Sequence, residues 1–308
     1  MAQSTALFRI GTRGSPLALV QARMVQARLA ETLGAAIDAL ELVTIRTSGD
    51  VIQDRPLAEE GGKGLFTKEI EEALLDSRID LAVHSAKDMP TVLPEGLILA
   101  ACLQREDPRD VFISAKAQSL AELPQGATLG TASLRRQAIA KRMRSDLRVV
   151  PLRGNVETRL RKLHEGQVDA TILALAGLRR LGLEKEATKV MDTAEFLPAV
   201  AQGAIGIETR ADNLRMRDAL ACIDHAATTS AIVCERAFLA ALDGSCKTPI
   251  AGHAILTNGL LQFRGMIVKP DGSAAHETAV AGAAKDAATI GADAGRALRQ
   301  YAGPGFFD

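Results

Sequence analysis

FRIGTRGSPLALV, residues 8–20, contains the pattern that decides the fold: a short apolar strand, a glycine-rich turn and a helix. The apolar residues after Pro16 recur at the spacing of one helix face through Leu29. A second copy, ATLGTASLRRQ, occupies residues 127–137. Ser15 and Ser133 stand where an N-cap residue belongs, at the start of each predicted helix.

Each copy continues with a matching series of elements. Apolar strands are predicted at 40–45 and 147–152, amphipathic helices at 65–75 and 156–163, and near-continuous apolar strands at 79–84 and 168–173. Strands that are covered on both faces and joined by helices indicate parallel βαβαβ lobes. A strand-like segment at 204–208 breaks the repeat and is expected to return the chain to the first lobe.

The pattern changes after residue 221. Thr228–Ser230 is predicted to cap a helix that ends at Asp243-Gly244, and three alternating strands follow at 250–256, 260–268 and 274–281. Turn residues such as Asn258-Gly259 predict an antiparallel meander, and a helix at 285–301 closes the chain.

The predicted fold class is therefore α/β. It has two periplasmic-binding-protein-like βαβ lobes with a ligand cleft between them, and a small C-terminal α+β domain with a three-stranded antiparallel sheet. The predicted domains are 1–103 with 204–221, then 104–203, and then 222–308.

Composition sets the broad class of protein. The 308 residues, 47% hydrophobic and 24% charged, are typical of a folded chain with more than one domain. No apolar run is long enough for a membrane helix, and the N-terminus lacks a secretory pattern. The four cysteines include no C-x-x-C pair, and Cys102, Cys222 and Cys234 are predicted to be core residues. We expect a cytoplasmic protein that binds no membrane and no metal and is a monomer.

Charge is balanced overall but not locally. The 37 basic and 37 acidic residues cancel, whereas residues 135–161 hold eight arginines and Lys141 against Asp146 and Glu157, a net charge of +7. Arginine pairs bidentately with carboxylates and phosphates, so this window favours a ligand rich in anionic groups. A solvated helix face is the alternative. Nucleic acid is disfavoured because the window has no aromatic residue on which bases could stack.

Two residues are candidates for covalent or proton chemistry. Asp88 follows the predicted strand in HSAKDMP, residues 84–90, where a carboxylate can transfer protons or stabilise a cationic intermediate beside Lys87 and Ser85; a plain turn residue is the alternative. His84 is expected to be a core histidine. Cys246 follows a helix C-terminus, which disfavours a reactive thiolate and leaves a covalent attachment point open. The polar loop 48–64 is expected to be a flap.

Together these segments resemble the porphobilinogen deaminase (hydroxymethylbilane synthase) family, and the resemblance spans essentially the whole chain. It is carried by Gly11-Thr12-Arg13-x-Ser15-x-Leu17-Ala18, Gly62-Lys63-Gly64-Leu65-Phe66, His84-Ser85-x-Lys87-Asp88-x-Pro90, Ser133-Leu134-Arg135-Arg136-Gln137, Arg153-Gly154-Asn155-Val156-x-Thr158-Arg159-Leu160 and Ala176-Gly177-Leu178-x-Arg180-Leu181. Around Cys246, Ser245 and Lys247 stand where the family often has Gly and Gln.

The resemblance implies a transferase of tetrapyrrole (haem and porphyrin) biosynthesis. Four porphobilinogen molecules would be deaminated and joined head to tail into hydroxymethylbilane on a dipyrromethane cofactor, attached through a thioether to Cys246. Asp88 would promote ammonia loss and stabilise the developing azafulvenium charge. The implied carboxylate-binding residues are Arg13, Ser15, Lys87, Ser133, Arg135, Arg136, Arg153, Arg159 and Arg180, and the other implied substrate-site residues are Gln21, Lys63, Phe66, Ser85 and Gln202.

One other class of protein stays open. A two-lobed solute binder or sensor could show the same repeat and arginine cluster without needing Asp88 or Cys246. Intact mass separates the two classes, because the enzyme should exceed its sequence mass by one dipyrrole.

Overall fold

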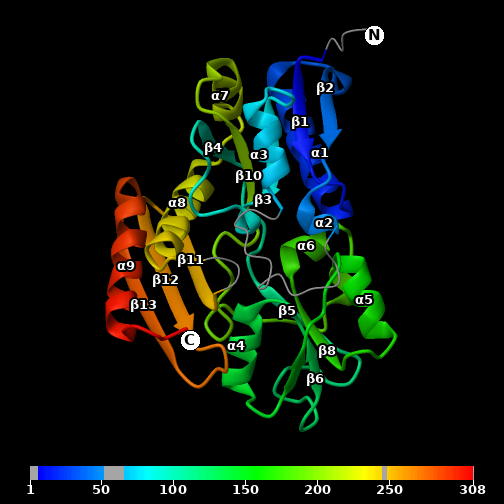
Figure 1. Ribbon diagram of the computed structural model, residues 1–308, viewed down its shortest axis with the longest axis vertical. Helices are drawn as coiled ribbons and strands as arrows, with labels where there is room; N and C mark the ends of the chain where they lie inside the picture. Colours follow the sequence, from blue (N-terminus) through cyan, green and yellow to red (C-terminus); the bar gives the residue numbers. More distant parts are fainter. Residues whose placement is uncertain (1–5, 52–65, 245–247, 308) are drawn as a thin grey trace. The chain divides into compact units, whose positions relative to one another are not determined.

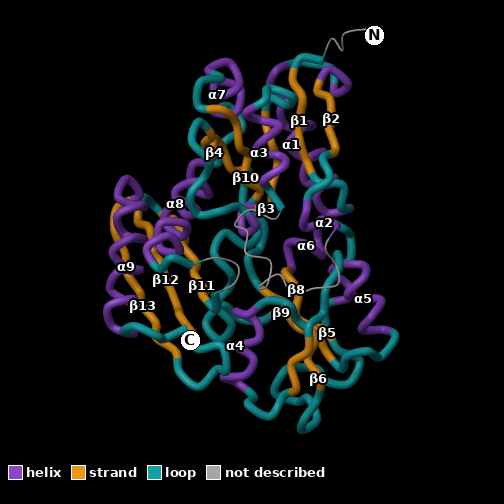
Figure 2. The backbone as a smooth tube through the Cα atoms, viewed as in Figure 1, coloured by secondary structure: helices purple, strands orange, loops and turns teal. Residues whose placement is uncertain are grey.

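The computed structural model describes residues 6–51, 66–244 and 248–307 (Figures 1 and 2). Its internal contacts divide the chain into two compact units. The first unit is Met1–Arg105 with Ala204–Thr229, and the second is Glu106–Gly203 with Ser230–Asp308. The three predicted domains, and the cleft expected between the lobes, stay predictions.

The first unit is built on one mixed five-stranded sheet. Its elements are β1 (Phe8–Thr12), α1 (Pro16–Leu33), η1 (Ile37–Ala39), β2 (Leu40–Thr44), α2 (Ser48–Val51), α3 (Lys68–Leu75), β3 (Leu81–Ser85), η2 (Ala86–Asp88), β4 (Leu97–Cys102), β10 (Ile205–Arg210) and α7 (Leu214–Ala221). The strand order is β2-β1-β3-β10-β4. Strand β1 is parallel to β2 and β3, whereas β10 is antiparallel to β3 and β4. The segment at 204–208 thus returns to the first sheet, as predicted.

Helices cover both faces of this sheet because its buried strands alternate their apolar side chains. Leu81 and Val83 of β3 pack with Ile207 of β10 against α1 and α7. Ala82, one residue out of phase, packs with Ile70 of α3 on the opposite face. Successive residues of β3 therefore face different helices.

The second unit contains a five-stranded sheet of the same arrangement: three parallel strands, then an antiparallel fourth strand, then a fifth strand antiparallel to the fourth. Its elements are β5 (Asp110–Ile113), β6 (Thr128–Gly130), α4 (Leu134–Met143), β7 (Arg148–Val150), α5 (Val156–His164), β8 (Ala170–Ala174), α6 (Leu175–Arg180), η3 (Glu184–Glu186) and β9 (Lys189–Val190). The order is β7-β6-β8-β5-β9, with β6 parallel to β7 and β8, and β5 antiparallel to β8 and β9. Helix α4 packs on one face, and α5 and α6 pack on the other.

The C-terminal part is the predicted antiparallel meander. Its elements are α8 (Ala226–Ala241), β11 (Ile250–Thr257), β12 (Leu260–Val268), β13 (Ala275–Ala283), η4 (Ala284–Asp286) and α9 (Ala287–Ala302). Asn258 and Gly259 both have positive φ, 52° and 80°, as the tight β11–β12 turn requires. Gly291 lets α9 approach α8 closely, since a Cβ there would collide with the Cys234 carbonyl group. The α/β class and the small three-stranded domain are confirmed.

Local capping chemistry explains where several helices begin. The Ser15 hydroxyl accepts a hydrogen bond from the Ala18 N–H at 3.3 Å, and the Ser133 hydroxyl accepts one from the Arg136 N–H at 3.4 Å. Both predicted N-caps are therefore confirmed. The predicted cap at Thr228–Ser230 is wrong: α8 begins at Ala226, and the His225 ring nitrogen accepts the Thr228 N–H at 3.3 Å.

Other expectations also differ from the structure. The sequence pattern predicts no strand at 97–102 or 110–113, yet these residues form β4 and β5. Cys222 is exposed rather than in the core, because it lies just beyond the last turn of α7. Of the predicted flap, Ser48–Val51 is helical and residues 52–64 lie outside the described residues. Within the described ranges, no helix combines the length and hydropathy needed to span a membrane.

Candidate active site

Asp88 lies at the carboxyl end of a central strand of the first unit. Strand β3 ends at Ser85, and η2 carries the chain through Asp88 to Met89, which is extended before Pro90 as predicted (φ −74°, ψ 143°). The side chain is exposed, and its carboxylate forms no hydrogen bond or ion pair with another described residue. Its negative charge is therefore available to a ligand.

Two side-chain pairs lie at the same end of the first sheet. Gln21 of α1 and Ser85 of β3 are hydrogen bonded through both amide atoms, at 3.0 and 3.1 Å. The Arg13 guanidinium lies 4.3 Å from the centre of the Phe66 ring, a cation–π contact. Ser15 caps α1, and Lys87 is half-buried in η2 beside Asp88. The predicted site residues that the structure describes in this unit thus come from three places. These are the β1–α1 turn with the start of α1, the end of β3 with η2, and the segment before α3.

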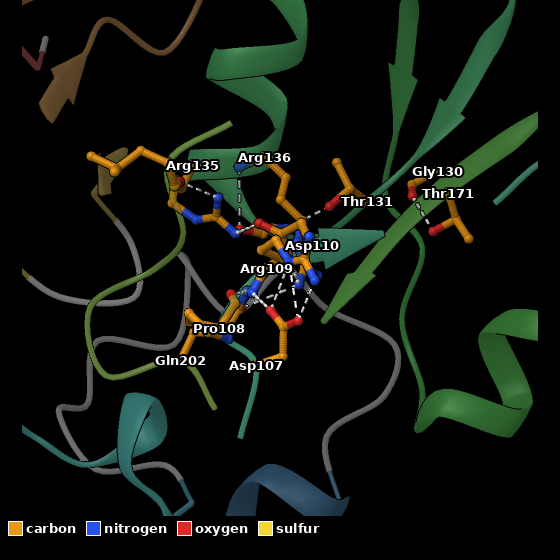
Figure 3. Close-up of polar contacts among 12 residues, drawn as sticks. Asp107, Pro108, Arg109, Asp110, Gly130, Thr131, Arg135, Arg136, Thr171 and Gln202 are labelled. Atoms are coloured by element: carbon orange, nitrogen blue, oxygen red, sulfur yellow. Dashed lines mark hydrogen bonds and ion pairs between the residues drawn. The ribbon is translucent and has the colours of Figure 1, made fainter. Parts of the chain in front are cut away.

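The second unit holds a buried ion cluster, which we call the arginine cluster: Asp110, Arg135 and Arg136 (Figure 3). Arg135 Nη2 lies 2.7 Å from Asp110 Oδ2, and Arg136 donates to Oδ1 from Nε at 3.0 Å and from Nη2 at 2.8 Å. The side chains of Arg135, Arg136 and Asp110 are 4%, 6% and 0% exposed. Both arginines lie in the first turn of α4, as its second and third residues after the N-cap Ser133.

The arginine cluster has more positive charge than negative. Burial alone would raise the pKa of Asp110, but the charges of Arg135 and Arg136 hold it below its ordinary value. One carboxylate neutralises only one of two guanidinium groups, and Arg135 Nε has no acceptor among the described residues. Gln202 supports the arrangement by donating to Pro108 O at 2.7 Å and to Asp110 Oδ1 at 3.1 Å. The cluster therefore retains capacity for an anion.

Two of the other predicted arginines of the second unit donate to backbone carbonyl groups. Arg159 Nε donates to Gly154 O at 2.8 Å, and Arg180 Nη2 donates to Gly203 O at 2.7 Å. Burial lowers the pKa of Arg180 to about 10. Arg180 Nε and Arg153 Nη1 are buried N–H groups with no acceptor in the described part of the chain. Buried donors are normally satisfied, so these two point to an absent acceptor.

Asp110 is the main element of this arrangement that sequence reasoning misses. Its only signal is an acidic residue directly before the apolar run Val111–Ile113. Neighbouring ion pairs were not predicted either. Arg109 donates hydrogen bonds to both carboxylate oxygens of Asp107, and Arg179 Nη1 lies 2.7 Å from Glu106 Oε1. Lys63 and Cys246 lie outside the described residues, so their predicted roles stay predictions.

Comparisons with known proteins identify the family. The model described as "Porphobilinogen deaminase, dipyromethane cofactor binding domain" matches residues 8–218, and "Porphobilinogen deaminase, C-terminal domain" matches residues 229–300. The porphobilinogen deaminases of Nitrobacter winogradskyi and Nitrobacter hamburgensis are 58% and 57% identical over 305 residues, which cover 99% of this chain and 96% of each relative. The chain belongs to the porphobilinogen deaminase family.

As a member of this family, the protein is a transferase of tetrapyrrole biosynthesis with a dipyrromethane cofactor. The predicted family membership, activity and cofactor are thereby confirmed. Among solved structures, the methionine-binding protein MetQ aligns with a TM-score of 0.45 and 16% identity, over 72% of this chain and 89% of that chain. A likeness that low carries no inference here.

The residues of the second unit fit the cofactor chemically. The buried N–H groups of Arg135, Arg153 and Arg180 that have no acceptor within the described ranges are forked cationic donors, which suit carboxylates. The described residues contain no group of three or more His, Cys, Asp or Glu side chains placed to hold a metal ion.

Proposed function

We propose that Asp88 is the catalytic residue with which this protein joins porphobilinogen molecules into hydroxymethylbilane. The observation that carries the proposal is the exposed Asp88 carboxylate at the end of β3, which makes no internal hydrogen bond or ion pair with any other described residue. Loss of ammonia from porphobilinogen leaves positive charge on the pyrrole. A fixed carboxylate stabilises that charge and accepts the pyrrole N–H, because it needs no reorganisation when the charge develops.

The arginines have a different role in this proposal. Each pyrrole ring carries two carboxylates, so a growing chain accumulates negative charge. Among the described residues, Arg135 and Arg136 have only Asp110 as a buried counter-charge, and Arg153 and Arg180 each keep a buried donor without an acceptor. These four guanidiniums bind acetate and propionate groups, helped by Ser133 and Arg159. Arg13, Ser15 and Lys87 do the same in the first unit.

Further residues orient the rings. The Arg13–Phe66 contact places an aromatic face beside a cation, and the Gln21–Ser85 pair offers an amide and a hydroxyl next to the Asp88 turn. Gln202 acts through the arginine cluster, and Lys63 contributes a cation from the predicted flap. The dipyrromethane, attached through a thioether to Cys246, supplies the primer on which the chain grows.

The proposal includes the setting of the enzyme. We place it in the cytoplasm as a monomer that binds porphobilinogen and no nucleic acid, with domains at 1–103 plus 204–221, 104–203 and 222–308. The absence of aromatic residues between 135 and 161 supports a small anionic ligand over single-stranded nucleic acid.

Intact-mass analysis of Cys246→Ser beside the wild type tests the attachment role. The expected result is a folded variant whose mass matches its sequence and which does not consume porphobilinogen, because the primer has no thioether. Unchanged activity, or extra dipyrrole mass on the variant, would contradict the role of Cys246.

A further inference from the structure

A second set of buried ionisable groups lies in the first unit, on the face of the sheet that α3 covers. We call it the acid cluster: Glu71 of α3, His84 of β3 and Glu208 of β10. His84 Nε2 lies 3.2 Å from Glu208 Oε2, and the two side chains are 3% and 0% exposed. Glu71 is 6% exposed. None of the three belongs to the site described above.

The acid cluster has few hydrogen-bond donors for its oxygens among the described residues: the His84 ring lies beside Glu208, and the Thr67 hydroxyl lies beside Glu71. Neither carboxylate oxygen of Glu208 has a hydrogen bond of good geometry within the described part of the chain, and neither does Glu71 Oε1. Two carboxylates and one imidazole can form one ion pair at most. Burial, together with repulsion by Glu208, raises the pKa of Glu71. An ionised carboxylate without a partner is costly in such a place, so burial there favours the protonated form of Glu71.

Other charged groups around α3 are engaged elsewhere. Helix α3 packs against β1, β3, β4 and β10. Two arginines on these five elements have other partners: Arg9 pairs with Asp80, and Arg210 donates to the backbone carbonyl groups of Leu74 and Ile79. On α3, Lys68 lies 4.0 Å from Glu72, and Glu69 accepts a hydrogen bond from Ser48. The Cys102 thiol is the remaining ionisable group. Among the described residues of these elements, His84 is therefore the ion-pair partner of Glu208.

The acid cluster is adjacent in sequence to the proposed catalytic turn. His84 directly precedes Ser85, and η2 with Lys87 and Asp88 follows. Glu71 lies in the first turn of α3, shortly after Phe66. Because side chains alternate along a strand, a slip of β3 by one residue would turn His84 away from Glu208 and turn Ser85 away from Gln21.

We propose that Glu71, His84 and Glu208 are positioning residues for Asp88. With one proton retained, the acid cluster holds β3 and β10 in one register and fastens the first turn of α3 to them. It thereby fixes the position at which β3 ends and η2 carries the Asp88 carboxylate. This inference rests on the proposed function, in which Asp88 acts on the substrate.

The test compares His84→Leu, His84→Gln and Ile70→Val in the full-length holoprotein. Ile70→Val is the matched control, since Ile70 is buried on the same helix but is apolar. We expect His84→Leu to lower kcat about 10–100-fold, with KM nearly unchanged, because small misplacements of a catalytic group cost that much. His84→Gln, which keeps an N–H near the Nε2 position, should recover most of kcat. Ile70→Val should lower Tm and leave kcat unchanged.

Hydrogen exchange gives a readout that does not depend on activity. His84→Leu should speed exchange of the Ala86 amide, which donates to Ala204 O at 3.0 Å, more than Ile70→Val does. If the wild type fails to turn over porphobilinogen, the proposed function fails, and this exchange still decides whether the acid cluster holds the turn. Equal exchange and equal kcat in the two variants would overturn the positioning role.

Glu71→Gln keeps the inference testable if His84→Leu does not fold. Glu71→Leu, which lacks any hydrogen-bonding group, should lower kcat about as much as His84→Leu. Glutamine imitates a protonated Glu71, so Glu71→Gln should recover most of that kcat near neutral pH. An equal loss of kcat in Glu71→Leu and Glu71→Gln would overturn the claim that the acid cluster retains a proton, and no loss in Glu71→Leu would overturn the positioning role of Glu71.

Discussion

The two five-stranded sheets have the same strand arrangement but opposite excesses of buried ionisable groups: acidic groups outnumber basic ones in the first sheet, and basic groups outnumber acidic ones in the second. In each, the fourth strand is antiparallel to the third and carries a fully buried carboxylate: Glu208 on β10 and Asp110 on β5. Around Glu208 lie a second carboxylate, Glu71, and one imidazole. Around Asp110 lie two guanidiniums.

This difference separates two tasks on one scaffold. In the described part of the chain, the acid cluster has more carboxylate oxygens than donors, which favours a protonated Glu71, and the exposed carboxylate of Asp88 follows it in sequence. Among the described residues, Arg135 Nε of the arginine cluster has no acceptor, so that cluster can bind a carboxylate of a ligand. In this account, the excess of buried acidic groups in the first sheet serves to position Asp88. The excess of buried arginines in the second sheet serves to bind carboxylates.

The largest expected effect is that of Asp88→Glu. The variant keeps the charge but displaces it by about a methylene, so kcat should fall about 10²–10⁴-fold, the range for a misplaced proton-transfer group. Folding and bound cofactor should be unaffected because Asp88 is exposed. Initial rates and intact mass measure both. Asp38→Glu, an exposed acid in η1, is the control, and wild-type turnover in Asp88→Glu would remove Asp88 from the mechanism.

The next effect is on stability. Asp110→Asn leaves two buried guanidiniums without a counter-charge and should lower the free energy of unfolding by about 3–5 kcal/mol. Glu208→Gln should cost clearly less, because the acid cluster keeps a second carboxylate, Glu71, beside His84. Denaturant unfolding of both variants measures the difference. An equal loss in the two variants would contradict the different ratios of acidic to basic groups in the two clusters.

Removal of one arginine should weaken substrate binding more than chemistry. Arg180→Gln loses a charge-assisted hydrogen bond, and KM for porphobilinogen should rise about 10–100-fold. The neighbouring exposed Arg179, which pairs with Glu106, serves as control through Arg179→Gln. Steady-state kinetics distinguish them; unchanged KM in Arg180→Gln would exclude that residue from carboxylate binding.

The two clusters should respond to pH in opposite directions. The lowered pKa of Asp110 contributes stability that is present above its unfolded value and is lost as pH falls through the folded value. The raised pKa of Glu71 contributes stability that is full below its unfolded value and is lost as pH rises through the folded value. Unfolding free energies across pH should show the alkaline loss in the wild type but not in Glu71→Gln; the same curve in both would contradict it.

The smallest effect is expected on the surface. Arg161 and Glu165 form an i,i+4 pair at 2.7 Å on α5, with both side chains largely exposed. Glu165→Gln should change the free energy of unfolding by only about 0.3–0.5 kcal/mol. A loss comparable to that of Asp110→Asn would show that burial does not set the energy of these pairs.

The sequence predicted those parts of the fold that depend on local chemistry. Ser15 and Ser133 cap helices, and Asn258-Gly259 closes a hairpin, because these effects act within a few residues. Strands β4 and β5 were not predicted, because they lack the glycine–threonine turn that follows β1 and β6. The antiparallel pairing of β4 with β10, and of β5 with β8 and β9, was therefore not predicted either. The interior pairing of Arg135 and Arg136 depends on Asp110, which is distant in sequence, so composition alone indicated only an anionic ligand.

The most direct test of the account is the intact mass of the wild type and Asp88→Glu, before and after addition of porphobilinogen. The account predicts that both proteins exceed their sequence mass by one dipyrrole. The wild type should then gain mass in steps of one pyrrole ring, and Asp88→Glu should gain it far more slowly. A wild type at its sequence mass, or an Asp88→Glu variant that gains rings at the wild-type rate, would contradict the account.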